Sequence, residues 1–292
     1  MTPPNYTRTD LAIEEEQLAT PQNGVIVREN TQNGIHFMRV EITNETGAKH
    51  LNRPIGHYIT LSFAPVWDEH EALDNETLHS ALVKNLSFLL HQSNKPTRIL
   101  VVGLGNRAIT ADAVGPLTAD KIHVTGHYAQ EDSLRPYLPP CPAFAISPGV
   151  VGTTGIETQK LIQAAISSSK PSHVIVIDSL AARSTDRLGR CIQLSNSGIS
   201  PGSGIGNHRA ALNQETLGVP VIAIGTPLVV SSSTLVFDAL EQAGITQISH
   251  ALLSVLEHGK SYFVTLNDSD LATAKLSEII ANAINTCIDS IT

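Results

Sequence analysis

Apolar and polar residues alternate through residues 24–42 on both sides of an Asn33-Gly34 pair. Such alternation is typical of strands with one buried face, and Asn-Gly favours the tight turn of a two-residue hairpin. The pattern therefore predicts a β-hairpin over 24–42. The run at 57–65 predicts a further strand, and leucines at near-helical spacing predict an amphipathic helix over 68–91.

From residue 98 onward the pattern changes to short apolar runs separated by helical stretches. The runs at 98–105, 173–182 and 219–225 are apolar at consecutive positions, as in strands buried on both faces of a parallel sheet. Helical spacing predicts a crossover helix over 155–168 and a closing helix over 271–291. We therefore predict an α/β fold with a mainly parallel sheet flanked by helices and a smaller β-rich N-terminal elaboration.

Composition and charge narrow the class of protein. The 292 residues are 41% hydrophobic, which suits a globular chain with a full core. The formal net charge is -8 with no block of like charge, which argues against nucleic acid or an anionic membrane as the main partner. With no secretory pattern and no long apolar stretch, a cytoplasmic protein is expected. The three widely spaced cysteines predict buried free thiols at Cys141, Cys191 and Cys287.

Two aspartates lie at or just beyond the ends of apolar runs, at the edge of an α/β sheet where ligands bind. Asp178 ends the run VIVID, and Asp112 follows ILVVG within the stretch AITADAVGP. An aspartate in such a turn often caps the next helix, so a capping role for Asp112 stays open. If the two strands are neighbours, both carboxylates face one cleft, where one can act as an acid while the other activates water.

Two glycine-rich loops and several histidines are further candidates. The loops at 148–158 and 198–209 let the backbone approach a ligand closely, although each can also be a surface turn. GLGN after the first buried strand does not complete a dinucleotide-binding fingerprint. His123 and His127 are four residues apart and could share a helix face as metal ligands, or lie at the surface.

Several long motifs resemble one known family. These are VVGLGNRAITADAVGP, PGVVGTTGIET, VIDSLAARSTDRLGRCIQLSNSGISPGSGIGNHR, ETLGVPVIAIGTPLVV and the closing YFVTLNDSDLATAKLSEIIANAINTCI. In this order they resemble the germination proteases of spore-forming bacteria, which degrade small acid-soluble spore proteins. The resemblance implies an endopeptidase of atypical aspartic type in the cytoplasm of the spore core, a fold similar to the hydrogenase maturation peptidases, and a homotetramer.

The same resemblance implies roles for particular residues. It assigns the two essential aspartates of the family to Asp112 and Asp178 and requires no cofactor. A divalent metal held by these acids and a histidine, such as His127 or His208, stays open, as does a non-catalytic ligand-binding α/β protein. The candidates for substrate binding or support are Arg183, Arg209, Gly149, Gly152, Gly202 and Gly204.

The N-terminal stretch YTRTDLAIEE resembles the self-processing site of the family. It implies a zymogen cleaved between Asp10 and Leu11, at an acidic residue followed by an apolar residue and alanine, as in the substrates. The stretch GNHRAAL is less basic than its counterpart in relatives, which leaves substrate preference open. The expected division is a propeptide at 1–10, a β-rich part of the catalytic unit at 11–66 and an α/β peptidase core at 67–292.

Overall fold

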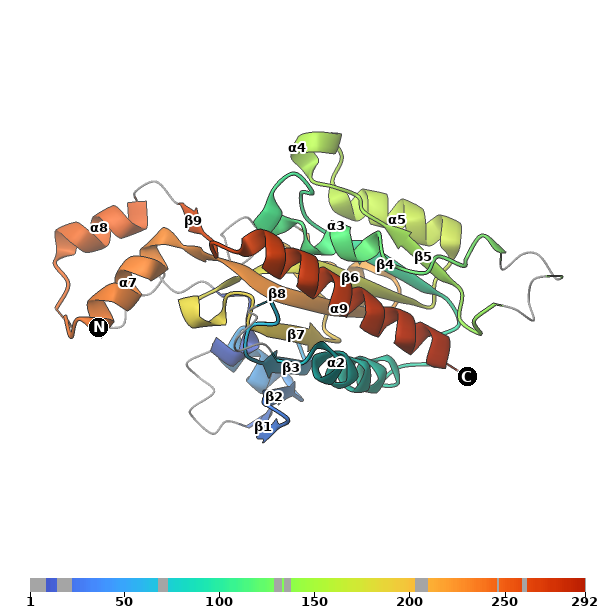
Figure 1. The fold of residues 1–292 in the computed structure, drawn as a ribbon, viewed down its shortest axis with the longest axis horizontal. Helices are drawn as coiled ribbons and strands as arrows, with labels where there is room; N and C mark the ends of the chain where they lie inside the picture. The colour runs from blue at the N-terminus through green and yellow to red at the C-terminus, as the bar shows by residue number, and fades with distance from the viewer. Residues whose placement is uncertain are drawn as a thin grey trace.

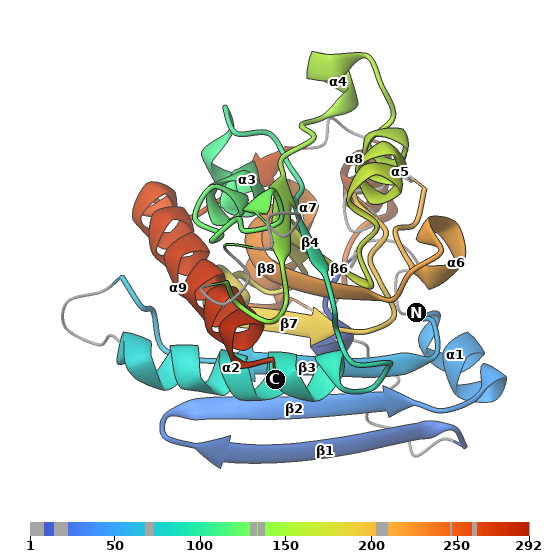
Figure 2. The same cartoon turned by 90° about the vertical axis from the view of Figure 1, so that its right-hand side faces the viewer.

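The computed structural model describes residues 9–14, 23–67, 73–128, 133, 138–202, 210–245, 247–258 and 262–291. Within these parts the chain forms a nine-stranded sheet in the order β1-β2-β3-β7-β8-β6-β4-β5, with β9 paired to β8 (Figures 1 and 2). The strands are β1 (Val25–Gln32), β2 (Ile35–Ile42), β3 (Gly56–Ser62), β4 (Ile99–Gly103), β5 (Ala143–Ile146), β6 (His173–Ala182), β7 (Cys191–Ser195), β8 (Val221–Ser231) and β9 (Phe263–Val264).

Helices and helical turns connect these strands. The α-helices are α1 (Glu45–Leu51), α2 (Asn75–Leu90), α3 (Val114–Ala119), α4 (Val151–Thr154), α5 (Thr158–Ser169), α6 (Gln214–Leu217), α7 (Ser232–Gln242), α8 (His250–His258) and α9 (Ser269–Ser290). The 3₁₀ turns used below are η1 (Ala12–Glu14), η3 (Thr110–Asp112) and η6 (Thr185–Arg187).

The four strands β8, β6, β4 and β5 are parallel and form one side of the sheet, with β5 at its edge. Three of them are the buried strands that the apolar runs predicted, so the α/β fold is confirmed. The strand β7, which the sequence pattern did not predict, pairs antiparallel with both β3 and β8. The sheet as a whole is therefore mixed, and the β-rich N-terminal part continues the central sheet.

The predicted hairpin is confirmed residue by residue. Gln32 pairs with Ile35, and the two turn residues between them, Asn33 and Gly34, have φ angles of 52° and 77°. Asparagine and glycine adopt positive φ at low cost, and this turn twists the two strands in the direction of the sheet. The second strand of the hairpin pairs with β3, which carries it to the rest of the sheet.

Helices cover both faces of the parallel strands. Ile99 and Val101 of β4 belong to the apolar cluster under α2 and α9, whereas Leu100 and Val102 belong to the cluster under α5. Figure 2 places α9 and α2 side by side on one face and α5 on the other. Alternate side chains of one strand thus fill two cores, which explains the continuous apolar runs in the sequence.

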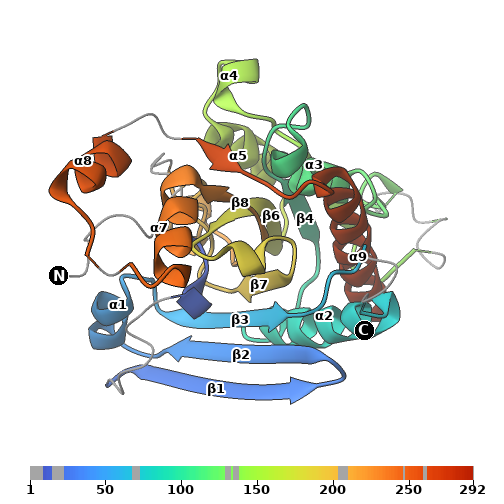
Figure 3. The ribbon, with the colours of Figure 1, turned by 60° about the vertical axis from the view of Figure 1, so that its left-hand side comes forward.

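The predicted helix over 68–91 begins at Asn75, where the Asp74 carboxylate accepts a hydrogen bond from the main-chain N–H of Thr77. Residues 68–72 lie outside the described residues. The pair α7 and α8 extends from one end of the sheet, and β9 returns beside β8 (Figures 1 and 3). None of the described helices is long and apolar enough to cross a membrane.

All three cysteines are buried and free, which confirms the expectation from their spacing. Burial raises the pKa of the Cys141 thiol to about 11 and that of Cys191 to about 12. It also raises the pKa of the Cys287 thiol. Thiols of this kind pack as small apolar groups and stay protonated near neutral pH.

Candidate active site

The strand order creates a crevice between β4 and β6. The chain passes from β4 to β5 on one side and then crosses back to β6 on the other side of β4. Ligands of parallel α/β sheets bind outside the carboxyl ends of the strands at such a reversal. The N–H of Leu104 donates to the carbonyl of Ile177 at 2.8 Å, which holds the turn after β4 against the middle of β6.

Two glycines let the Asp112 turn approach the strand ends. A Cβ atom on Gly115 would lie 2.2 Å from the carbonyl oxygen of Leu104. A Cβ atom on Gly105, whose φ is +111°, would lie 2.0 Å from the carbonyl oxygen of Asp112. Both distances are too short for any side chain, so the close approach requires glycine at both positions.

Asp112 ends the turn η3 and does not cap the following helix. The N-cap of α3 is Ala113, which makes no side-chain capping bond, so the capping interpretation is wrong. The Asp112 carboxylate instead accepts a hydrogen bond from the main-chain N–H of Asn106 at 2.8 Å. That bond closes the loop after β4 and fixes the position of the carboxylate beside the crevice.

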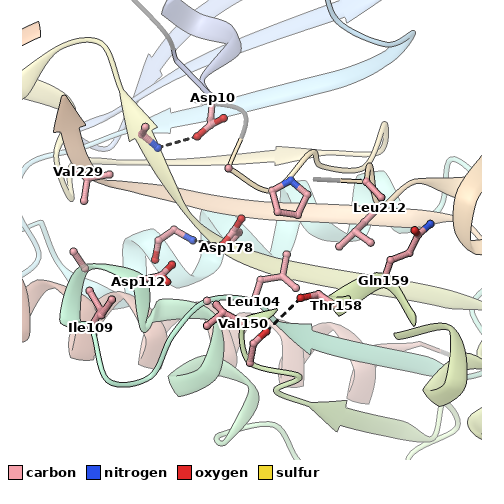
Figure 4. Close-up of a pocket in the computed structure, with 18 of the residues that line it drawn as sticks. Asp10, Leu104, Ile109, Asp112, Val150, Thr158, Gln159, Asp178, Leu212 and Val229 are labelled. Atoms are coloured by element: carbon pink, nitrogen blue, oxygen red, sulfur yellow. Dashed lines mark hydrogen bonds between the residues drawn. The ribbon is translucent and has the colours of Figure 1, made fainter. Parts of the chain in front are cut away.

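Asp178 lies in β6, opposite Gly225 of β8, and is only 7% exposed. Its carboxylate accepts a hydrogen bond from the main-chain N–H of Ser179 at 3.0 Å. Asp112 and Asp178 line the same cleft of about 270 Å³, and Figure 4 shows them on adjoining walls, one from the turn after β4 and one from β6. The fold therefore brings together the two acids that the strand-end argument selected.

The first glycine-rich loop and the start of α5 line another wall of the cleft. Gly149 and Val150 lie there with Glu157, Thr158 and Gln159. The Thr158 hydroxyl donates to the carbonyl of Gly149 at 3.4 Å, which ties the loop to the helix (Figure 4). The sequence indicated the glycines of this loop but gave no signal for the polar residues of α5.

The remaining candidates for substrate binding or support do not all lie in the cleft. Gly202 lines the cleft, whereas Gly152 lies in α4 and is not among the described residues of the lining. Gly204, His208 and Arg209 lie outside the described residues. The main-chain N–H of Arg183 donates to the Glu14 carboxylate, as described below.

His123 and His127 do not share a helix face, because residues 123–127 form no helix. The N–H of Gly126 donates to the carbonyl of Ala143, at the amino end of β5. Asp178 lies toward the carboxyl ends of the parallel strands, so His127 stands at the wrong edge of the sheet to join a metal site there.

Within the described residues no group of three histidine, cysteine or carboxylate side chains is arranged to hold a metal ion. Asp112 and Asp178 supply oxygen atoms of the kind that divalent metals prefer, but they are only part of a ligand set. The other candidate ligand, His208, lies outside the described residues.

The segment around the predicted cleavage site also reaches the cleft. Asp10 lines it together with Asp112 and Asp178. The main-chain N–H of Asp10 donates to the carbonyl of Ala181 at 3.1 Å, and the N–H of Ala181 donates to the Asp10 carboxylate at 2.9 Å (Figure 4). This docking could not be read from the sequence, because it joins residues 171 positions apart.

A model of the germination protease family matches residues 6–251. The chain belongs to the germination protease family. It is 38% identical over 275 residues to a germination protease of Clostridium perfringens, covering 90% of this chain and 81% of the relative. To a germination protease of Caldanaerobacter subterraneus it is 44% identical over 236 residues, covering 80% and 72%. Membership in this family makes the chain a peptidase of spore germination.

Among solved structures, a [NiFe] hydrogenase maturation protease from Thermococcus kodakarensis is 16% identical, with a TM-score of 0.37. That match covers 68% of this chain and 98% of the hydrogenase maturation protease.

Proposed function

We propose that this chain is an endopeptidase that starts the degradation of small acid-soluble spore proteins, and that Asp112 and Asp178 activate the water that hydrolyses the peptide bond. The observation that carries the proposal is the meeting of these two carboxylates in one cleft beside the carboxyl end of β4. In a protease family, two acids from separate parts of the fold that share a cleft are the natural candidates for acid and base.

The two carboxylates divide the chemistry between them. The ionised one takes a proton from a water molecule, and the water oxygen attacks the carbonyl carbon of the peptide bond. The protonated one donates its proton to the departing amine nitrogen, so that the C–N bond breaks without a covalent enzyme intermediate. Like charges in one partly closed cleft repel each other, which favours the state in which the pair holds a single proton.

We further propose that the chain is a zymogen that cleaves its own Asp10–Leu11 bond and loses residues 1–10. The position of Asp10 in the lining of the same cleft supports this step. A homotetramer in the cytoplasm of the spore core is proposed from the resemblance to the family alone.

Conservative substitution of each acid tests the assignment. Asp112→Asn and Asp178→Asn keep the size of the side chain and remove the charge, so neither protein should produce a chain that begins at Leu11. Mass spectrometry after incubation measures the new N-terminus, and circular dichroism checks the fold. The matched control is Asp186→Asn at an exposed position, which should process normally. Normal processing by either cleft variant would refute the assignment.

A metal-dependent peptidase built on the same two acids is the second candidate, because the chemistry of the donor set fits a divalent cation. A bound metal would polarise the carbonyl or lower the pKa of a bound water. Treatment with a chelator, followed by elemental analysis and a rate measurement, distinguishes the metal-dependent mechanism from the metal-free one. A loss of activity that added metal restores would support the metal route, and an unchanged rate in metal-free protein would exclude it.

A further inference from the structure

Residues 9–14 lie in a groove that runs from the cleft past the end of β6 and the middle of β7. Figure 3 shows this part of the chain, in dark blue, next to β3, and its turn η1 contacts β2 and β3. Leu11 is fully buried and Ala12 is 1% exposed. A segment this deeply covered is held by specific contacts, and those contacts fall at successive residues.

The carbonyl of Asp10 has two side-chain donors. Nη1 of Arg53 lies 3.2 Å from this oxygen, and Nε2 of Gln193 lies 3.1 Å from it. The amide of Gln193 also accepts the main-chain N–H of Ala12 at 2.6 Å. Gln193 thus binds the backbone on both sides of the Asp10–Leu11 bond, and this fixes which peptide bond stands at that place in the groove.

The next two side chains fill apolar pockets. Leu11 packs in a cluster with Leu180, Leu188 and Val230. Ala12 belongs to a second cluster with Tyr58 and other side chains of the β-rich part. The groove therefore receives a large apolar residue followed by a small one.

The Glu14 side chain is only 4% exposed, and its carboxylate is surrounded by donors. The main-chain N–H groups of Arg183 and Ser184 donate to it at 2.8 and 3.1 Å. Nε of Arg187 in η6 lies 3.1 Å from Oε1. A buried carboxylate is costly unless it is hydrogen-bonded and paired, and this pocket supplies both kinds of contact.

We propose that this groove binds peptide substrates in the way it holds residues 9–14, and that Arg187 selects a carboxylate at the fourth residue after the cleaved bond. Counted from Leu11, Glu14 is that fourth residue. The inference rests on the proposed function and adds a specificity residue to it. It follows that the chain's own segment and a substrate compete for one groove, so the segment must leave before a substrate enters.

Two synthetic peptides test the proposal, and they leave the fold of the protein untouched. One carries the sequence of residues 5–18, and the other is identical except for Gln in place of the glutamate equivalent to Glu14. The processed protein should cleave the first with a kcat/KM about tenfold to a hundredfold higher, mainly through KM, because a charged hydrogen-bonded pair is lost. Arg187→Gln should reduce this preference to less than threefold. The control, Arg190→Gln at an exposed position, should keep it.

The outcomes separate the two proposals. If the wild-type chain cleaves neither peptide, the proposed function fails. If it cleaves both at equal rates, or if Arg187→Gln keeps the full preference, the groove assignment is wrong while the peptidase assignment stands. If Arg187→Gln does not fold, the comparison of the two peptides on the wild-type chain still decides, since equal rates overturn the proposal.

Discussion

Replacement of Gly105 by alanine is a direct probe of how Asp112 is placed. The added Cβ would lie 2.0 Å from the carbonyl oxygen of Asp112, whereas real Cβ contacts essentially never fall below 3.0 Å. One of the two groups must therefore move by at least about 1 Å, the difference between these distances. The φ of +111° is also unfavourable for alanine.

The size of the effect follows from this displacement. A misplacement of about 1 Å at a catalytic group can lower a rate about a hundredfold. That factor corresponds to about 2.7 kcal/mol in the activation free energy. Backbone strain at such a φ lowers the free energy of unfolding by about 1–3 kcal/mol in addition, which a protein with a large core tolerates.

The assay is the cleavage rate of the peptide of residues 5–18, with the melting temperature measured in parallel. Gly105→Ala should lose about two orders of magnitude in kcat while remaining folded. The matched control is Gly218→Ala, because Gly218 also has a positive φ, of 76°, but a Cβ atom there meets nothing within 4 Å, and its kcat should stay within about twofold. A folded Gly105→Ala protein with a wild-type kcat would refute the idea that the turn positions a catalytic carboxylate.

Three further predictions concern the groove, the core and the thiols. Arg53→Met removes the side-chain bonds to the carbonyls of Thr9 and Asp10, so the rate of self-cleavage measured by mass spectrometry should fall about tenfold to a hundredfold; an unchanged rate would contradict this. Leu276→Ala opens a cavity in the fully buried core under α9 and should lower the free energy of unfolding, measured in urea, by about 2–5 kcal/mol. Because the pKa values of Cys141 and Cys191 are raised above the 9.0 of an exposed thiol, both should resist alkylation at about pH 8 until the chain unfolds. The contribution of these two protonated thiols to the free energy of unfolding is complete below pH 9 and falls as the pH rises above it. Rapid labelling of either thiol in the native protein would contradict its burial.

The elements that the sequence predicted are those whose pattern is local. The hairpin depends on alternation around Asn33 and Gly34, and β4 and β6 are apolar at consecutive positions because both of their faces are covered. The strand β7 was missed because two of its five residues, Gln193 and Ser195, are polar, although both are buried. Their burial results from packing between β3 and β8, which no local pattern contains.

In the candidate site, too, the residues that could be predicted are those that a local rule identifies. Asp112 and Asp178 were found because strand ends in α/β sheets meet at one edge, a rule that needs only the positions of the strands. The capping role of Asp112 was wrong because the chain turns through η3 before α3 begins at Val114. Arg53, Gln193 and Arg187 gave no signal, since each acts on residues 9–14 from far along the chain.

A double-mutant cycle on the two aspartates tests the central claim most directly. The measurement is kcat for the peptide of residues 5–18 with Asp112→Asn, Asp178→Asn and the double variant. If both carboxylates act on one water, either change removes the pathway, and the double variant should be no slower than the slower single variant. The account would be contradicted if the increases in activation free energy of the two single variants added up in the double variant. A wild-type kcat in either single variant would contradict it as well.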